Sequence, residues 1–300
     1  MILILVLASS LALQSSGPAN HQVADASLAA RIEALFHAFL TADDDTAPIA
    51  EARRIYDERG LPSIAQVGDE ASYKFVVLLV SEKLPLDLRT QIASKANEAA
   101  ARHEIPSDAA TFYTVRLRLE KLQDAAKAHP PLDPALRDEV GRMFKVDQAV
   151  RQQQGFDAKK MAEVDRQNAA PLQAILDKYG VPTYSMVGPE AAAEFITMIQ
   201  HQPAQFRQEV LPTLKANVDA GQADPQSYAG AYDRSQRDLG KPQLYGQQLE
   251  CKARETMHEA PIEDEPHVNQ RRAELGLIRV ELYARITAEM MPQFCPPSQP

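Results

Sequence analysis

The stretch from Gly60 to Ser81 reads GLPSIAQVGDEASYKFVVLLVS, and the stretch from Gly180 to His201 reads GVPTYSMVGPEAAAEFITMIQH. The two align without a gap at an offset of 120 residues, with seven identical positions. Each begins with a glycine just after a helical pattern, continues as a short connector, and ends as a helix with acidic residues in its first turn. The sequence therefore predicts two copies of one helical unit.

The likeness extends beyond these stretches. Farther along the chain the offset becomes 118, with Arg89 opposite Arg207 and Arg116 opposite Arg234. A loop shortened by two residues between helices would produce this slip. The segment HPPLDP at 129–134 would break a helix, because proline lacks the donor N–H and clashes with the preceding turn. We place the boundary between the copies there.

Composition and apolar spacing favour helices throughout the chain. Glycine occurs only 12 times, hydrophobic residues make up 45%, and apolar residues recur at helical spacing, as in LRDEVGRMFKVDQAVRQQ at 136–153. No strand of appreciable length is expected. We predict an all-α fold of two tandem related helical units: a degenerate copy at 25–130, a helical domain at 135–290 and a flexible tail at 291–300.

The N-terminus indicates export. The segment MILILVLASSLALQSSG at 1–17 has an apolar run that suits a signal peptide, although the usual basic residues are missing. The run is shorter than the ~20 residues of a membrane span. We expect a periplasmic or secreted protein that does not span the membrane after signal removal; a short buried helix is the alternative. Cys251 and Cys295 could pair in an exported chain or remain two free thiols.

Charge and missing motifs exclude several classes of protein. The formal net charge is -9 and no long basic run appears, which excludes nucleic acid as a partner. The sequence lacks a nucleophile elbow, a phosphate loop and a dinucleotide fingerprint. The segment HEAPIEDEPH at 258–267 holds two histidines and four carboxylates without metal-ligand spacing. We expect no metal, no cofactor, and an unknown polar ligand or envelope protein as partner.

The duplication helps to separate fold from function. A polar residue found in one copy is a better functional candidate than one that both copies keep. The second copy differs from the first at three such positions: Gln200 for Val80, His201 for Ser81 and Asp233 for Val115. Arg234, opposite Arg116, instead suits a structural ion pair or a helix cap. The segment GKPQLYGQQ at 240–248 has no clear counterpart, so we expect the second copy to carry the function.

Several short motifs follow one another in the second copy. They are DQAVR at 147–151, GVPTYSMVG at 180–188, QH at 200–201, YDR at 232–234, GKPQLYGQQ, PIED at 261–264 and RRAELGL at 271–277. In this order they resemble a bacterial domain-of-unknown-function family, numbered 6624, over about Leu136 to Tyr283. In the family's Q-x-Y-G-T-Q signature Gln247 replaces Thr, and LIRVEL replaces a final Leu-Pro-Pro-Leu-like stretch. The resemblance implies a helical architecture and a polar cluster, without a known reaction.

His201 and Asp233 are the candidate catalytic residues. Histidine exchanges protons near neutral pH, and a carboxylate such as Asp233 could orient the imidazole. A structural interpretation is also open, in which His201 caps its helix and Asp233 forms a surface salt bridge. Asp147 and Arg151, four residues apart, have the spacing of a helical ion pair.

The other candidates are polar side chains that could contact a ligand. Amides supply uncharged donors and acceptors, and Gly246 would let the backbone approach a ligand closely. The same side chains could instead satisfy buried helix ends and pin the loop, and Asp264 could cap the next helix. The predicted ligand-binding residues are Gln200, Arg234, Gln243, Tyr245, Gln248, Asp264 and Arg271.

Three functional hypotheses stay open. The first is an exported binding module that holds a peptide, a glycan or another small polar molecule, or a protein partner, through the C-terminal half. The second is a hydrolase-type enzyme in which His201 is the base and Asp233 orients it. The third is a structural or interaction protein whose polar motifs only fasten loops. The position of these side chains relative to a cleft distinguishes the three.

Overall fold

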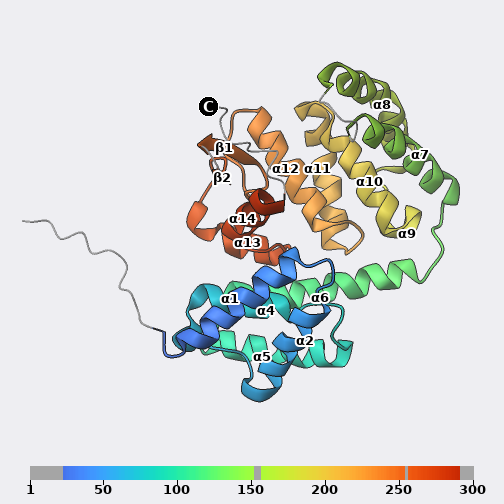
Figure 1. Cartoon of the computed structure of the whole chain (residues 1–300). Helices are drawn as coiled ribbons and strands as arrows, with labels where there is room; N and C mark the ends of the chain where they lie inside the picture. The colour runs from blue at the N-terminus through green and yellow to red at the C-terminus, as the bar shows by residue number, and fades with distance from the viewer. Residues whose placement is uncertain (1–22, 152–156, 254–255, 291–300) are drawn as a thin grey trace, which may run out of the picture.

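The computed structural model describes residues 23–151, 157–253 and 256–290, without the side chains of 251–259 and Met290. The predicted signal peptide, the tail and Cys295 lie outside the described residues, as does the Cys251 side chain. Helices dominate the described chain, which confirms the all-α prediction (Figure 1). In this part of the chain no helix is both long and apolar enough to cross a membrane.

The described N-terminal half packs its helices around one apolar core. Ile32, Phe75 and Tyr113 lie at its centre with no exposed surface. The helices are α1 (Ala26–Thr41), α2 (Thr46–Arg59), the single-turn α3 (Ile64–Val67), α4 (Asp69–Leu78), α5 (Leu86–Ala101) and the long α6 (Ser107–Lys127). The segment 129–134 then separates α6 from the next helix, as its three prolines predict.

The next helices follow the same order and enclose a second core. Val140, Phe195 and Leu214 have no exposed surface there. The helices are α7 (Pro134–Arg151), α8 (Ala158–Tyr179), the single-turn α9 (Tyr184–Val187), α10 (Pro189–Gln200), α11 (Ala204–Asp219) and α12 (Pro225–Asp238). Each of α1 to α6 therefore has a counterpart at the same place in the series α7 to α12.

Local geometry also agrees between the two halves. Gly60 and Gly180 end α2 and α8 with φ of 76° and 72°, a left-handed conformation that favours glycine. Ser63 and Thr183 cap the single-turn helices with their side chains. A backbone hydrogen bond from Ile64 N to Glu104 O (2.7 Å) has its counterpart from Tyr184 N to Gln222 O (2.9 Å). These features support the duplication, which stays a prediction.

A short hairpin follows α12 and was not expected from the sequence. Strands β1 (Leu249–Ala253) and β2 (Thr256–Glu259) pair antiparallel. The expectation of no strand is wrong here, because two strands of four or five residues are too short to give a clear alternating pattern. Beyond them lie the 3-10 helix η1 (Glu265–His267), α13 (Val268–Glu274) and α14 (Val280–Met290).

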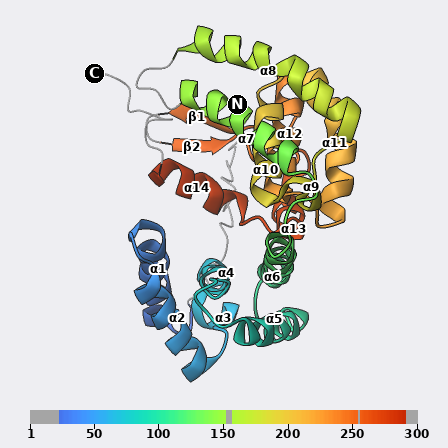
Figure 2. The same cartoon turned by 90° about the vertical axis from the view of Figure 1, so that its right-hand side faces the viewer.

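Helices α13 and α14 join the two halves. Both lie between the two groups of helices in Figures 1 and 2, with α13 against α6. Ala273 and Leu282 belong to the N-terminal core, whereas Leu277 between the two helices belongs to the second core. Helices α13 and α14 therefore pack against the half that comes first in the sequence.

Candidate functional site

A broad cleft of about 1190 Å³ opens at the C-terminal end of α10, between α8 and α12. Five arginines and two aspartates line it. The sequence analysis singled out four of its lining residues as functional candidates: Gln200, His201, Arg234 and Gln248. The cleft therefore brings together residues from the end of α10, from α12 and from the loop that follows α12.

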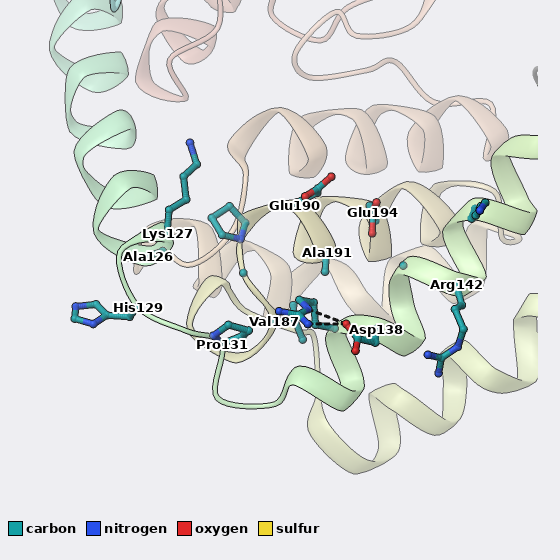
Figure 3. Close-up of a pocket in the computed structure, with 15 residues that line it drawn as sticks. Ala126, Lys127, His129, Pro131, Asp138, Arg142, Val187, Glu190, Ala191 and Glu194 are labelled. Atoms are coloured by element: carbon teal, nitrogen blue, oxygen red, sulfur yellow. Dashed lines mark hydrogen bonds and ion pairs between the residues drawn. The ribbon is translucent and has the colours of Figure 1, made fainter.

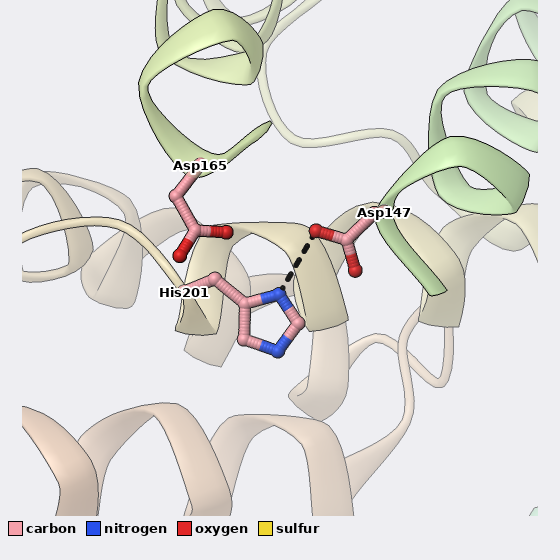
Figure 4. Close-up of side chains that lie close together, drawn as sticks. All are labelled: Asp147, Asp165 and His201. Atoms are coloured by element: carbon pink, nitrogen blue, oxygen red, sulfur yellow. Dashed lines mark hydrogen bonds and ion pairs between the residues drawn. The ribbon is translucent and has the colours of Figure 1, made fainter. Parts of the chain in front are cut away.

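His201 is held in this cleft by a buried carboxylate. The residue follows the last turn of α10, and its Nδ1 lies 3.1 Å from Oδ1 of Asp147 on α7. Asp147 has no exposed surface, whereas the His201 side chain keeps 16% of its surface exposed. Figure 4 shows the second ring nitrogen pointing away from both nearby carboxylates. The imidazole is thus fixed on one side and available on the other.

Asp147 also forms the ion pair with Arg151 that their spacing predicts. The Arg151 Nη1 lies 3.0 Å from Oδ1 of Asp147, and the same guanidinium binds Asp165 on α8. Burial by itself would raise the pKa of Asp147, but the hydrogen bond from His201 and the positive charge of Arg151 hold that pKa below its usual value. Asp147 is therefore an ionised carboxylate that anchors both the imidazole and the guanidinium.

Asp147, Asp165 and His201 each offer a ligand atom within 4.8 Å of the others (Figure 4). Such a trio has the donors that a divalent transition metal accepts. However, Arg151 already places its positive charge between the two carboxylates and donates to both. The guanidinium thus offsets one of the two negative charges of this donor set and already pairs with both carboxylates.

Asp233 does not contact His201, and the predicted pair of the two is wrong. It is fully buried on α12, and its oxygens accept hydrogen bonds from the backbone N–H groups of Leu244, Tyr245 and Gln247 at 2.8 to 3.2 Å. Burial raises the pKa of Asp233, and these amides partly offset that effect. The residue holds the 240–248 loop in place.

The other loop candidates serve the same structure. Gln243 is buried, and its amide donates to Gln248 O (3.0 Å) and Ala260 O (2.7 Å) and accepts from Gln248 N (2.8 Å). Arg271 donates to Leu244 O (3.1 Å) and Glu263 O (2.7 Å). Among the described residues, Gln243 and Arg271 therefore bond to backbone groups and hold the loop in place, as the structural interpretation predicts.

Tyr245 and Asp264 likewise lie outside the lining of the cleft. The Tyr245 ring packs edge-on against Tyr228 and Tyr232, with centroids 6.0 and 5.9 Å apart. Asp264 is exposed and bonds His267 at 2.8 Å; its side chain makes no capping hydrogen bond to the short helix that follows. Of the predicted ligand-binding residues only Gln200, Arg234 and Gln248 line the cleft.

The matched arginines behave differently from one another. Arg207 is buried and satisfied by Gln200 O, Gln202 O and Asp238. Its counterpart Arg89 binds Glu120 at 2.7 Å in the same way. This pair belongs to the shared architecture. Arg234, by contrast, has a buried Nε without a hydrogen-bond partner among the described residues, and no ion pair between described side chains includes it, so the ion pair or cap inferred from Arg116 is not found there.

Sequence reasoning missed Asp147 as the partner of His201, although a signal was present. Val140, Phe144 and Asp147 are spaced so that they share one face of α7, and Val140 is completely buried. A carboxylate on an apolar face needs a cationic or hydrogen-bonding partner. Nothing local in the sequence identifies Asp165, because its neighbours are distant in the chain.

The comparisons with known proteins agree with the sequence resemblance. The profile of a family of unknown function (DUF6624) matches residues 134–292, from the first residue of α7 to just beyond α14. The chain belongs to this family. No curated protein and no solved structure matches the chain. The DUF6624 match contains the whole cleft and the His201–Asp147 pair, whereas the helices α1 to α6 precede it.

Proposed function

We propose that the DUF6624 half of the protein binds a small polar ligand in the cleft between α8 and α12, and that His201 exchanges a proton with it. The observation that carries this proposal is the Nδ1 contact between His201, which lines the cleft, and the fully buried Asp147. Acid–base chemistry of the hydrolase type follows, with Asp147 replacing Asp233 as the orienting carboxylate.

The contact with Asp147 has a chemical consequence for the imidazole. A carboxylate at Nδ1 favours the tautomer that carries its proton there, which leaves Nε2 as an acceptor. Arg151 and the buried position fix the carboxylate itself. His201 therefore meets a ligand with one basic nitrogen in a defined orientation, as a general base requires.

A second cavity, of about 810 Å³, lies at the junction of the two halves and offers a comparison (Figure 3). It is lined by both basic and acidic residues. These include the exposed pair Arg137 and Asp138, whose side chains form a hydrogen bond of 2.7 Å. An exposed ion pair of this kind contributes little to stability and does not hold a catalytic side chain in a fixed orientation. The cavity has no buried carboxylate–histidine pair, so the cleft at His201 is the better candidate.

The proposal is tested by NMR on the ring nitrogens of His201. We expect one neutral tautomer with the proton on Nδ1, and polar fragments that bind should shift Nε2. His267 is a matched control, because it contacts Asp264 at 2.8 Å but is exposed. If binding fragments leave His201 unchanged and shift residues of the junction cavity instead, the proposal is wrong.

The effect of replacing His201 on a reaction rate distinguishes a catalytic function from a pure binding function. Once a turnover reaction is found, His201→Gln should lower its rate by about a hundredfold or more while binding persists, because general acid–base catalysis contributes about 10²–10⁴-fold. Equal rates in the variant and the wild type would mean that His201 takes no part in the chemical step. We further propose, from the apolar segment at 1–17, that this chemistry takes place outside the cytoplasm.

A further inference from the structure

Arginines outnumber aspartates among the residues that line the cleft, although the protein is negative overall. The chain carries a formal net charge of -9, yet five arginines against two aspartates line the cleft. Low-dielectric walls around charges of one sign focus the field and attract counter-ions. The cleft is therefore suited to an anionic group rather than to a neutral one.

Most of these arginines have a carboxylate partner. Arg151 binds Asp147 and Asp165, Arg166 binds Glu163, Arg207 binds Asp238, and Arg237 lies 3.6 Å from Glu250. Arg234 forms no ion pair with a described carboxylate, and the nearby Asp238 is already bound to Arg207. The Nε of Arg234 is also buried without a hydrogen-bond partner among the described residues. This guanidinium is the cation of the cleft that an incoming anion can pair with.

An unpaired, largely buried guanidinium costs the fold free energy. Burial, together with the positive charges of Arg207, Arg237 and Arg151, lowers the pKa of Arg234 below its usual value. Buried charges are normally paired, because the loss of hydration is not otherwise offset. Proteins keep such costly arrangements at sites that a ligand completes.

We propose that Arg234, with Arg237 at the rim, forms an oxyanion subsite that holds a phosphate group of the ligand beside His201. This inference rests on the proposed function and deepens it by naming the class of ligand, a phosphate monoester. Guanidinium groups match phosphate oxygens with two parallel N–H donors. Arg234 and Arg237, whose contact with Glu250 is 3.6 Å long, together offer more N–H donors than a single carboxylate accepts, which suits the several oxygens of a phosphate group.

The position beside His201 gives the subsite a chemical meaning. Gln200 and His201 end α10, and Arg234 lies on the facing helix α12, so all three line one cleft. Gln200 is itself tied to α12, since its amide lies 3.5 Å from Ser227 O. A phosphate held by Arg234 would place the rest of the ligand, or its ester oxygen, within the cleft that His201 faces.

Inorganic phosphate is the probe for this subsite, in calorimetric titrations at fixed ionic strength. We expect the wild type to bind phosphate saturably. The affinity should be weaker by about tenfold or more in Arg234→Gln, because this variant loses one charged hydrogen-bonding group. Arg234→Lys should recover part of the affinity, because lysine keeps the charge but not the fork. Arg116→Gln is the matched control on exposed surface of the first half and should bind phosphate as the wild type does.

Thermal unfolding separates a ligand site from architecture. Since Arg234 lacks a described partner, Arg234→Gln should keep or raise the melting temperature while it loses phosphate. The side chain of Arg237 is 47% exposed, so Arg237→Gln should fold normally and also weaken phosphate binding. If Arg234→Gln does not fold, Arg237→Gln still shows whether this part of the cleft binds phosphate.

Three results would overturn the inference: no saturable phosphate binding by the wild type, phosphate affinity in Arg234→Gln and Arg237→Gln equal to that of the wild type, or acetate binding as tightly as phosphate. Failure of the proposed function would give a different result. In that case polar fragments would not shift the NMR signals of His201, whereas the affinity for phosphate would still depend on Arg234.

Discussion

At the scale of single residues, two buried aspartates of the DUF6624 half serve different purposes. Asp147 contacts His201 and Arg151, and these partners hold its pKa below the usual value. Asp233 accepts only from backbone amides among the described residues, and burial raises its pKa. A carboxylate paired with charged groups can serve chemistry, whereas one surrounded by amides organises a loop.

Asp147→Asn tests the anchoring role. We expect the free energy of unfolding to fall by about 1–3 kcal/mol near neutral pH, because His201 and Arg151 lose their charged partner. The pKa of Asp147 in the fold lies below its ordinary value of about 3.9. Its ionised form therefore stabilises the protein above that value, and the contribution disappears as the pH falls through the lowered pKa.

The measurement is urea unfolding of both proteins at neutral pH and at about pH 3. The gap between Asp147→Asn and the wild type should shrink in acid. Asp138→Asn is the control, because Asp138 is exposed and contacts only Arg137 among the described residues. A gap that stays the same at both pH values would mean that the charge of Asp147 does not stabilise the fold.

The sequence could identify His201 but not its partner. The contrast of His201 with Ser81 needs only an alignment of the two halves. The pairing with Asp147 depends on how α7 crosses the end of α10, a packing contact across 54 residues of chain. Asp233, only one residue from Arg234, was paired with His201 on chemistry alone, and adjacent helical residues point in different directions.

At the scale of elements, the 240–248 loop is a pinned segment with one side on the cleft. Gln243 and Asp233 hold its backbone from the inside, and Gln248 at its end lines the cleft. Its amide-rich composition therefore has a structural cause, since buried N–H and C=O groups need partners. The sequence predicted such a tied loop but could not decide which of its glutamines faces a ligand.

Gly246→Ala is expected to destabilise this element strongly. Gly246 has φ of 70°, and a Cβ there would overlap Val280 Cγ2 on α14. Left-handed strain and overpacking together should cost about 2–4 kcal/mol. Gly240→Ala is the matched control, because Gly240 has φ of 69° but no atom within 4 Å of the added Cβ.

The measurement for this pair is the urea midpoint of each variant. Gly240→Ala should lose only about 1–2 kcal/mol from the backbone strain. Equal losses in the two variants would show that the close approach of the loop to α14 does not matter. Single-residue propensity would predict that equality, because it does not include the neighbouring helix.

At the scale of the whole molecule, the two halves are locked by Arg279. It lies between α13 and α14 in the DUF6624 half, and its guanidinium donates to Asp108 at 2.6 and 2.8 Å and to Asp69. The same guanidinium stacks 4.3 Å from the centre of the Tyr73 ring. All three partners belong to the first half, so the helices α1 to α6 support the elements that close the second half.

Arg279→Gln should therefore uncouple the halves. We expect a loss of about 3 kcal/mol, because Asp108 stays buried without its cation, and unfolding that separates into two transitions. Arg285→Gln is the control, since its ion pair with Glu70 is 3.2 Å long and exposed. Differential scanning calorimetry measures the stability and the number of transitions of both variants. A single transition with unchanged stability in Arg279→Gln would contradict the coupling of the two halves.

The sequence predicted this overall plan only in part. Helical periodicity and the HPPLDP segment placed the break that the structure shows between α6 and α7. The contact of Arg279 with Asp108 spans 171 residues, and no local pattern encodes it. The hairpin was missed for a related reason, since the two short strands pair with each other and β2 lies against α14, contacts that the composition of neither strand encodes.

The most direct test of the cleft as a functional site is a phosphate titration that follows two nuclei at once, the Nε2 of His201 and the Nε of Arg234, by nitrogen-15 NMR. We predict that both signals shift along one saturation curve, while those of His267 and Arg116 stay constant. Shifts that do not saturate, or that leave His201 and Arg234 unchanged, would contradict the proposal that these residues form one site.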